Sequence, residues 1–426
     1  MENEKITITP ASHLRGEITV PGDKSISHRA VMLGAIADGT THISGFLNGA
    51  DCLSTISCFE KMGIRTEIDK TNVTVYGKGM HALHEPHEIL YTGNSGTTTR
   101  LITGLLCAQN FSSTVDGDSS IRKRPMKRIR TPLEMMGADI SSDFCPLTIC
   151  GKPLHGISYT LPVASAQLKS ALILAALYAD GDTVITEPVQ SRNHTELMLA
   201  QMGAKLVCEN GRVTVSKTGR LHACDITVPA DISSAAFFMT AAAIVPNSQI
   251  TLKNVGINRT RSGIIDVFEM MGANLKTENE RFFGGEKVCD ITVSSSSLHG
   301  CTIGGSIIPR LIDEIPAIAA AAVFADGETI IKDASELKVK ESNRLDAIVA
   351  ELTRCGADVT ATSDGMIIRG GKPIHGADFK TYNDHRMAMS MAVLALGAQG
   401  ESTIENPAAV DISFPNFFEL LNSLKR

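Results

Sequence analysis

Hydrophobic and polar positions alternate along the chain in a pattern that returns six times. In each copy a short run typical of a β-strand is followed by a polar loop, and then by a segment rich in Ala, Leu and Met that predicts a helix. The copies begin, about 70 residues apart, at Gly16, His87, Gly156, Cys224, Cys301 and Asp378. A repeat of this length predicts a fold assembled from six copies of one supersecondary unit.

The register continues beyond the first helix, because each helix passes through a turn into a second predicted strand. These strands fall at residues 40–45, 112–117, 182–188, 248–254, 328–334 and 401–407. In five copies a second helix follows and ends at a glycine that can adopt the left-handed cap conformation, namely Gly63, Gly137, Gly203, Gly272 or Gly356. We therefore predict α/β units of the order β-α-β-α-β-β.

Composition limits the classes of protein and partner. The chain has 426 residues, 43% of them hydrophobic, which is enough for two domains of three copies each. A net charge of −6, no Trp and 4% aromatic residues argue against a general nucleic-acid or membrane-surface binder. The ten cysteines show no CxxC or metal-ligand spacing, and no segment has the length and hydrophobicity to span a membrane. We expect a cytoplasmic protein without a metal site or a disulfide framework.

The polar loop of each copy leads into a helix N-terminus, where free backbone N–H groups and the helix dipole attract anions. These loops carry basic residues, among them Lys24, Arg29, Arg100, Lys169, Arg310 and Arg386, and four of the six loops place Arg or Lys within the first helical turns. The fourth loop, Asp231 to Ser234, has none. Helix caps explain the Ser, Thr, Asp and Asn residues of the loops, but a cation in the first turns opposes the dipole. A bound anion would remove this conflict.

Two basic clusters lie outside those loops. The run from Arg122 to Arg130 holds six basic residues in nine, and the acidic balance of the whole chain favours a small phosphorylated ligand there over nucleic acid. The second cluster, from Lys338 to Arg344, is equally consistent with ordinary charge pairs at a helix start. Asp313 could be a plain carboxylate of a helix N-terminus, and His385 a structural histidine. With no GxGxxG or GxxxxGK[ST] loop, the residues suggest transfer between two small anions without identifying them.

Motifs spread over the whole chain carry a resemblance. These are PGDKSISHR, YTGNSGTTTR, KRPM, ASAQLKSA, SRNHTE, IDEIPAIA, KVKESNR, DHRMAM and SFPNFFELL. In this order they resemble the 5-enolpyruvylshikimate-3-phosphate synthase family. The resemblance implies a two-domain inside-out α/β barrel with three repeats per domain, one domain formed by residues 1–20 and 233–426, the other by 21–232, and an active site in the cleft between them.

The resemblance also implies the reaction: transfer of the enolpyruvyl group of phosphoenolpyruvate to the 5-hydroxyl of shikimate 3-phosphate, with release of phosphate through a tetrahedral intermediate. This is a transferase step of chorismate and aromatic amino-acid biosynthesis that uses no metal or organic cofactor. Glyphosate is the expected inhibitor, and the expected oligomeric state is a monomer.

Carried over by position, the residues fall into three groups. Those that resemble ligands of shikimate 3-phosphate are Lys24, Ser25, Arg29, Ser165, Gln167 and Ser191, and those that resemble ligands of phosphoenolpyruvate are Gly96, Arg124, Arg344 and Arg386. Asn94, Ala166, Arg192, Lys340 and His385 are further substrate-binding candidates, while Asp313, Glu341 and Lys24 are the catalytic candidates. The chain departs from some members at His194, which replaces Tyr, at Ala166, which replaces Ser, and at Ile412, which replaces a substrate-contacting Lys.

Two alternatives remain at this point. The sister enzyme that acts on UDP-N-acetylglucosamine shares the repeated fold, but its cysteine-bearing loop would fall near residues 116–126, which contain no Cys. A noncatalytic scaffold that binds acidic partners through the basic run is the other, and its affinity would fall steeply with salt if the partner were nucleic acid.

Overall fold

The computed structural model describes residues 4–425 and groups them into two compact units. Unit 1 comprises the residues up to Pro21, Pro229–Arg281 and the residues from Lys287 onward, and unit 2 comprises Gly22–Val228 and Phe282–Glu286. The second boundary lies before residue 229 rather than at 232/233. The reason is that Ala230 pairs with Val255 and Asp231 caps a helix, and both contacts are made inside unit 1.

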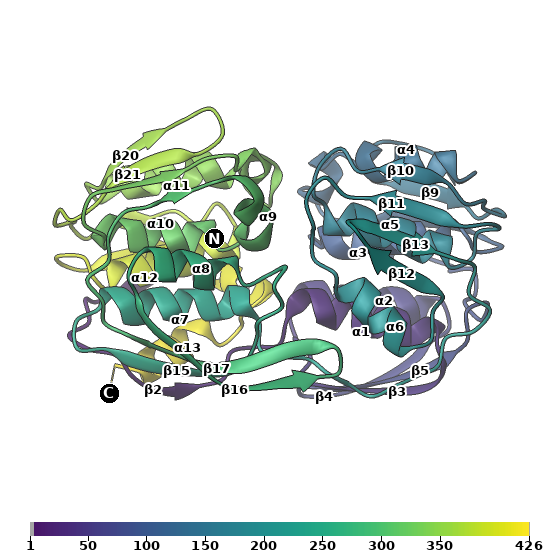
Figure 1. Ribbon diagram of the computed structural model, residues 1–426, viewed down its shortest axis with the longest axis horizontal. Helices are drawn as coiled ribbons and strands as arrows, with labels where there is room; N and C mark the ends of the chain where they lie inside the picture. The colour runs from purple at the N-terminus through teal and green to yellow at the C-terminus, as the bar shows by residue number, and fades with distance from the viewer. Residues whose placement is uncertain (1–3, 426) are drawn as a thin grey trace. The chain divides into compact units, whose positions relative to one another are not determined.

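Unit 2 contains three repeats. In chain order its elements are α1 (Lys24–Ile36), β3 (Asp38–Ser44), α2 (Ala50–Lys61), β4 (Arg65–Asp69), β5 (Asn72–Lys78), β6 (Leu90–Tyr91), α3 (Gly96–Leu106), β7 (Ser112–Asp116), η1 (Ile121–Lys123), α4 (Lys127–Met135), β8 (Asp139–Ile140), β9 (Leu147–Cys150), β10 (Ser158–Thr160), α5 (Ala166–Ala176), β11 (Thr183–Thr186), α6 (His194–Gln201), β12 (Leu206–Glu209), β13 (Arg212–Val215) and β14 (Ile226–Thr227) (Figure 1).

Unit 1 contains the other three repeats together with the N-terminal strands. Its elements are β1 (Lys5–Ile8), β2 (Arg15–Ile18), α7 (Ile232–Ile244), β15 (Gln249–Gly256), α8 (Gly263–Met270), β16 (Asn274–Phe283), β17 (Glu286–Ser294), β18 (Thr302–Ile303), η2 (Gly305–Ile307), α9 (Ile308–Leu311), α10 (Ile315–Phe324), β19 (Glu328–Ile331), η3 (Ser335–Val339), α11 (Arg344–Arg354), β20 (Asp358–Ala361), β21 (Met366–Arg369), β22 (Asp378–Phe379), α12 (His385–Ala395), β23 (Ser402–Glu405), η4 (Pro407–Ile412) and α13 (Phe417–Ser423).

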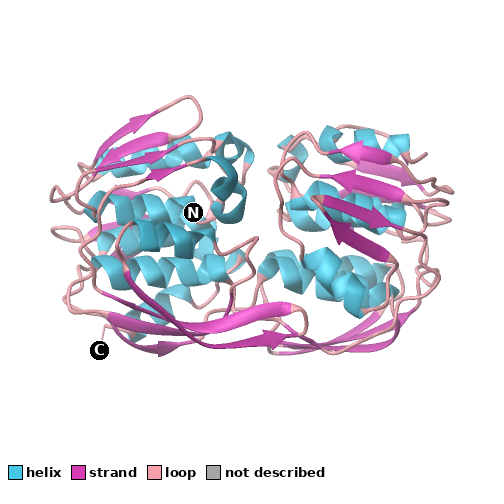
Figure 2. Ribbon diagram, in the orientation of Figure 1, coloured by secondary structure: helices cyan, strands magenta, loops and turns pink. Residues whose placement is uncertain are grey.

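The predicted α/β fold is confirmed, and each predicted second strand is present. Within residues 4–425 the strands form six sheets, five of four strands and one of three. A typical sheet has the order β6-β7-β9-β8, in which β6 and β7 are parallel and the other neighbours are antiparallel. In each unit the sheets lie on the outside and the helices within (Figure 2).

The repeats are not six contiguous pieces of chain, which the sequence pattern had suggested. The first strand of the first repeat, β2, pairs in parallel with β15 of the fourth repeat. Conversely, the first strand of the fourth repeat, β14, pairs in parallel with β3 of the first. The sixth sheet is completed by β1, which runs antiparallel to β23. Each unit therefore closes its sheets with strands from distant parts of the chain.

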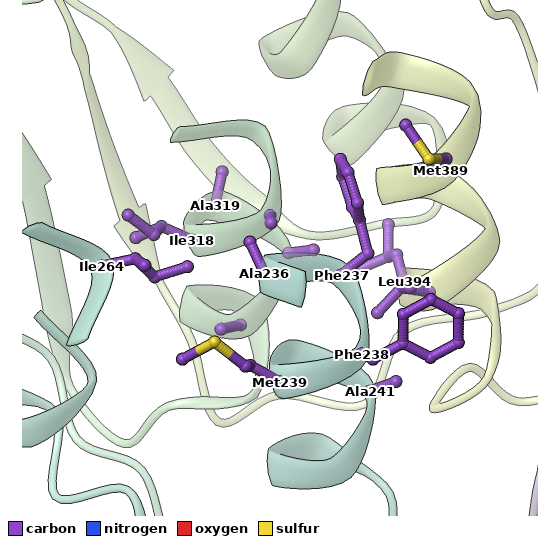
Figure 3. Packing of buried hydrophobic residues seen from close by; sticks show 14 of the residues in the cluster. Ala236, Phe237, Phe238, Met239, Ala241, Ile264, Ile318, Ala319, Met389 and Leu394 are labelled. Atoms are coloured by element: carbon purple, nitrogen blue, oxygen red, sulfur yellow. The ribbon is translucent and has the colours of Figure 1, made fainter. Parts of the chain in front are cut away.

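The first helices of the repeats form the interior of each unit. In unit 1 these are α7, α10 and α12, and their small side chains let them pack closely around Phe237 and Phe238 (Figure 3). The C-terminal motif contributes to the same core, because the Phe238 and Phe414 rings lie 5.7 Å apart. In unit 2 the corresponding helices are α1, α3 and α5. A Cβ added at Gly104 of α3 would lie 2.2 Å from the carbonyl oxygen of Ala171 on α5, so glycine is required at this approach.

The glycines that end the second helices share a partner that the sequence pattern did not suggest. All five have positive φ, between 75° and 100°. In each repeat a later histidine donates its backbone N–H to the carbonyl oxygen of the residue just before the glycine. These histidines are His84, His155, His222, His299 and His375. Their rings lie next to the glycines. A Cβ would approach the ring closely at three of them, to 3.0 Å at Gly63, 2.5 Å at Gly272 and 3.2 Å at Gly356, and would make an ordinary contact of 3.5 Å at the other two.

We predict that Gly272→Ala destabilises unit 1 more than Gly327→Ala. Both glycines have a positive φ, and that backbone conformation costs an alanine about 1–2 kcal/mol. Only at Gly272 would the new Cβ also meet a side chain, at 2.5 Å from Cε1 of His299, which adds about 1 kcal/mol or more of overpacking. Urea unfolding of both variants measures the difference, and equal losses would show that His299 moves aside freely.

Candidate active site

Three helix N-termini of unit 2 carry side-chain caps. Asp23 accepts from Ile26 N at 2.9 Å, Ser95 from Thr98 N at 3.1 Å and Ser165 from Leu168 N at 3.4 Å. The caps satisfy part of the free N–H set, and the helix dipoles still favour negative charge beside these loops. All candidate residues numbered below 228 lie in this unit, and all later ones lie in unit 1.

Arg29 is buried in α1, and its guanidinium donates hydrogen bonds to neutral groups. It donates from Nε to Thr195 Oγ1 at 2.7 Å, from Nη1 to Ser25 O at 2.8 Å and from Nη2 to Ser170 Oγ at 2.8 Å. Burial lowers the pKa of this guanidinium to about 10, although nearby carboxylates, first Glu196, counteract the shift. A buried cation held by neutral groups is well suited to an anionic ligand.

Other cations stand around the same helix. Lys24 Nζ lies 3.1 Å from Asp51 Oδ2, and Arg192 donates to Ser25 Oγ at 3.4 Å. Burial, followed by the charges of Lys24 and Arg29, lowers the pKa of His28 well below its usual range. His28 is therefore a neutral core residue bonded to Thr55, rather than a further cation.

A second group surrounds the N-terminus of α3. Arg124 donates to Asn94 Oδ1 at 2.7 Å, and Arg100 donates to Gln167 Oε1 at 2.7 Å. A Cβ on Gly96 would lie 2.9 Å from Nη1 of Arg100 and 3.1 Å from Nη1 of Arg124. Asn94, Gly96, Arg124 and Gln167 are thus brought together at one helix end, beside the N-terminal residues Ser165 and Ala166 of α5.

The basic run does not act as one patch. Arg122 pairs with Asp116, and Arg130 pairs with Glu134 and Asp143. Arg124 is buried and joins the loop before α3, whereas its neighbours Arg122 and Lys123 are exposed. This separation favours a single ligand-facing arginine over a nucleic-acid surface.

Lys169 was expected to serve an anionic ligand, but the chain itself supplies its partners. Its ammonium group lies 2.8 Å from Glu187 and 2.7 Å from Glu196, and its side chain is 1% exposed. Ser191 is held by the same cluster, because its N–H and its hydroxyl both donate to Glu187. Lys169 is therefore not a direct anion ligand.

His194 also has a partner that the sequence did not reveal. Its Nδ1 lies 2.6 Å from Oε1 of Glu286, which belongs to the short segment 282–286 of unit 2. The two residues are separated by 92 positions, so only the fold could show this pair.

In unit 1 the candidate residues converge on Arg344. Its side chain is 1% exposed, and it donates from Nε to Asp384 at 2.8 Å and from Nη1 to Asp313 at 3.2 Å, while Nη2 contacts Glu341 and Asp384. Burial disfavours the charged guanidinium, yet Asp384, Glu341 and Asp313 together raise the pKa of Arg344 above its usual value. Burial on its own would raise the pKa of the Asp384 carboxyl. The charge of Arg344 opposes this effect and holds that pKa below its usual range.

Further cations surround Asp313. Lys340 Nζ lies 3.4 Å from Asp313 Oδ1, and Arg386 donates from Nη1 to the Asp313 carbonyl oxygen at 3.1 Å. His385 is fully buried, with Nδ1 3.9 Å from Asp384 Oδ1. The arrangement places three carboxylates and three cations in one cluster, which provides proton-transfer groups beside anion-binding groups.

In two loops of unit 1 the cations and their partners differ from what the sequence indicated. The fourth loop lacks a cation of its own, but the buried Arg261 donates to Asp231 at 3.0 Å and to Ser233 at 2.6 Å. In the fifth loop Arg310 turns to Arg259 O and Asp266, both at 2.6 Å. Ile412, the position without the expected lysine, closes η4 as a half-buried aliphatic residue.

Within residues 4–425 no group of three His, Cys, Asp or Glu side chains is arranged to hold a metal ion. In that same part of the chain, no helix combines the length and hydrophobicity needed to cross a membrane.

Comparison with known proteins extends the match beyond single motifs. Residues 8–421 match the family model described as EPSP synthase (3-phosphoshikimate 1-carboxyvinyltransferase). The chain is 53% identical to the 3-phosphoshikimate 1-carboxyvinyltransferase of Thermoanaerobacter sp. (strain X514), over 98% of this chain and 100% of the relative. It is 54% identical to the enzyme of that name from Bacillus thuringiensis subsp. konkukian (strain 97-27), over 99% of each chain.

A solved structure agrees with these relatives in fold. The EPSP synthase of Acinetobacter baumannii superposes with a TM-score of 0.88 and 45% identity, covering 99% of this chain and 98% of that one. Because sequence and fold agree over nearly the full length, the chain belongs to the EPSP synthase (3-phosphoshikimate 1-carboxyvinyltransferase) family.

Proposed function

We propose that the clusters around Arg29, Arg124 and Arg344 carry out the reaction of this family on this chain. The reaction transfers the enolpyruvyl group of phosphoenolpyruvate to the 5-hydroxyl of shikimate 3-phosphate and releases phosphate, as a step of the shikimate pathway. Family membership over nearly the full length supports this transfer above the UDP-N-acetylglucosamine enzyme and the noncatalytic scaffold.

The proposed ligands of shikimate 3-phosphate come from the loops of unit 2. They are Lys24, Ser25, Arg29, Ser165, Ala166, Gln167, Ser191 and Arg192. Buried Arg29 and the capped N-terminus of α5 support a phosphate-binding role, because a guanidinium and a helix N-terminus both favour a dianion. Gly96 and Arg124, with Asn94 beside them, are the proposed ligands of phosphoenolpyruvate in this unit.

The observation that carries the proposal is the crowding of carboxylates on Arg344. This guanidinium contacts Asp313, Glu341 and Asp384 at once. We propose that Arg344 and Arg386 bind the carboxylate of phosphoenolpyruvate, with Lys340 and His385 lining the same wall. A new carboxylate must then displace one already present. Glu341 is the most exposed of the three, with 18% of its side chain accessible, and it would be released from Nη2.

That displacement gives the released carboxylate its chemical role. The acceptor hydroxyl must lose a proton as its oxygen attacks C2 of phosphoenolpyruvate, while C3 gains a proton to become a methyl group. Elimination of phosphate from the tetrahedral adduct then removes a proton from that methyl group and restores the double bond. We propose Asp313 as the base for the hydroxyl and Glu341, once released, as the acid and later the base at carbon. Lys24 stabilises the developing charge, and exchange of proton roles between these groups is the alternative.

The remaining proposals concern the setting of the enzyme. We propose that it acts as a monomer in the cytoplasm, where its ten free cysteines would stay reduced. No nucleic-acid or membrane partner is needed for the reaction.

We predict that the wild-type chain releases phosphate from phosphoenolpyruvate with shikimate 3-phosphate but not with UDP-N-acetylglucosamine as acceptor. A coupled phosphate-release assay with each acceptor in turn is the direct measurement. Turnover with the nucleotide sugar, or with neither acceptor, would contradict the proposed function.

We predict that Asp313→Asn and Glu341→Gln each lower turnover by about 10²- to 10⁴-fold, the usual contribution of a positioned acid or base. Substrate binding should persist, because each amide keeps the size of its carboxylate. Solvent deuterium should enter the methylene group of unreacted phosphoenolpyruvate with the wild type and not with Glu341→Gln. Turnover near the wild-type value in that variant would remove Glu341 from the mechanism.

We predict that the chain is inhibited by glyphosate and that Gly96→Ala weakens this inhibition by about tenfold or more, because one added methyl in a close-fitting pocket has this effect. The new Cβ would push against the guanidinium groups of Arg100 and Arg124. Inhibition constants of both proteins provide the test. Gly219→Ala is the control, since nothing lies within 4 Å of that position. An unchanged constant in Gly96→Ala would show that this glycine does not limit the inhibitor.

A further inference from the structure

Unit 2 contains a buried charge cluster that the reaction scheme does not yet use. Lys169 lies between Glu187 and Glu196, and the three side chains are between 1% and 4% exposed. Two carboxylates and one ammonium group leave one negative charge in excess. Such a cluster is costly to bury.

The cluster lies next to two proposed ligands of the substrate phosphate, Ser191 and Arg29. On one side Glu187 accepts from the N–H of Ser191 at 3.1 Å and from its hydroxyl, and Lys169 donates to Ser191 O at 3.4 Å. Ser191 is therefore fixed through its N–H, its carbonyl oxygen and its hydroxyl.

On the other side the cluster adjoins Arg29. The neighbours of Lys169 and Glu196 in sequence, Ser170 and Thr195, both accept hydrogen bonds from the Arg29 guanidinium. Their own hydroxyls lie 2.7 Å apart. Oε2 of Glu196 is buried and has no hydrogen-bond partner within residues 4–425, while Oε1 pairs directly with Lys169.

A phosphate dianion bound beside Ser191 and Arg29 would interact electrostatically with this cluster. Two buried carboxylates would repel it strongly, since charges in a low-dielectric interior act over several ångströms. The single hydroxyl proton of Ser191 is also engaged with Glu187, and phosphate offers only acceptors. Ser191 must therefore turn its proton from Glu187 to the phosphate, which leaves Lys169 to compensate Glu187.

We propose that Lys169 is a positioning residue for the phosphate group of shikimate 3-phosphate, which acts by offsetting part of the negative charge of Glu187 and Glu196 next to Ser191 and Arg29. This inference rests on the proposed function, because it takes Ser191 and Arg29 as ligands of that phosphate. It predicts a defect that is specific for the phosphate of one substrate.

The decisive variant is Lys169→Met, which keeps much of the length of the side chain and removes the charge. We expect KM for shikimate 3-phosphate to rise about tenfold or more, because an unscreened buried charge now opposes the dianion. KM for phosphoenolpyruvate and the inhibition constant of shikimate, which lacks the phosphate, should stay at wild-type values. Lys217→Met is the control, since this exposed lysine of the same unit pairs with the exposed Asp180, and both KM values should be unchanged.

A second substitution tests whether charge is the cause. Lys169→Met/Glu196→Gln restores the wild-type net charge of the cluster, so KM for shikimate 3-phosphate should return close to the wild-type value. A double variant as impaired as the single one would overturn the proposal. An unchanged KM in a cooperatively melting Lys169→Met protein, or equal losses for shikimate and shikimate 3-phosphate, would overturn it as well.

If Lys169→Met does not fold, Glu196→Gln alone carries the test. Removing one carboxylate leaves the cluster neutral, so KM for shikimate 3-phosphate should fall below the wild-type value, and an equal or higher KM would refute the inference. Failure of the proposed function itself is recognised separately, because the wild-type protein would then show no activity that depends on shikimate 3-phosphate.

Discussion

A helix that is buried along its whole length can present chemistry only at its ends, and this constraint organises both units. The helices α7, α10 and α12 of unit 1 are packed on nearly all sides by apolar residues, as are α1, α3 and α5 of unit 2. Their C-terminal ends lead into the outer sheets. The polar loops at their N-termini are therefore the places where the repeated unit can bind a ligand, and the dipoles make that ligand an anion.

The clusters at these ends are not built alike, which suits two different substrates. In unit 2, Arg29 is buried and donates to hydroxyl and carbonyl oxygens, so the hydrogen bonds of its guanidinium go to neutral groups. In unit 1, Arg344 contacts three carboxylates, and Lys340 and Arg386 stand beside Asp313, so proton-transfer groups and anion-binding cations are mixed there. The first environment suits a phosphate dianion, and the second suits acid–base chemistry beside a carboxylate that competes for the same guanidinium.

The sequence predicted the repeat, its strands and its glycine caps because each of these features depends on residues that are neighbours in the chain. It could not predict that β2 and β14 exchange sheets, since strand pairing between residues 234 and 183 positions apart leaves no local pattern. The histidines opposite the glycine caps could have been noticed, because Leu or Ile precedes the histidine in all five copies. The pairing of His194 with Glu286 had no such signal, as its members lie in different repeats.

The same distinction explains which cations could be assigned to ligands. Three cations lie close to predicted helix starts, namely Lys169, Arg310 and Arg29. The sequence alone gives no reason to assign them different roles. The fold separates them by their partners: Lys169 has two glutamates, Arg310 has Asp266, and Arg29 has hydroxyl and carbonyl oxygens. A cation that is already paired with carboxylates supports the site indirectly, without contacting the ligand. A cation such as Arg29, which is hydrogen-bonded to neutral groups, keeps its charge available to an incoming anion. Charge balance therefore decides between roles that the position in the motif leaves open.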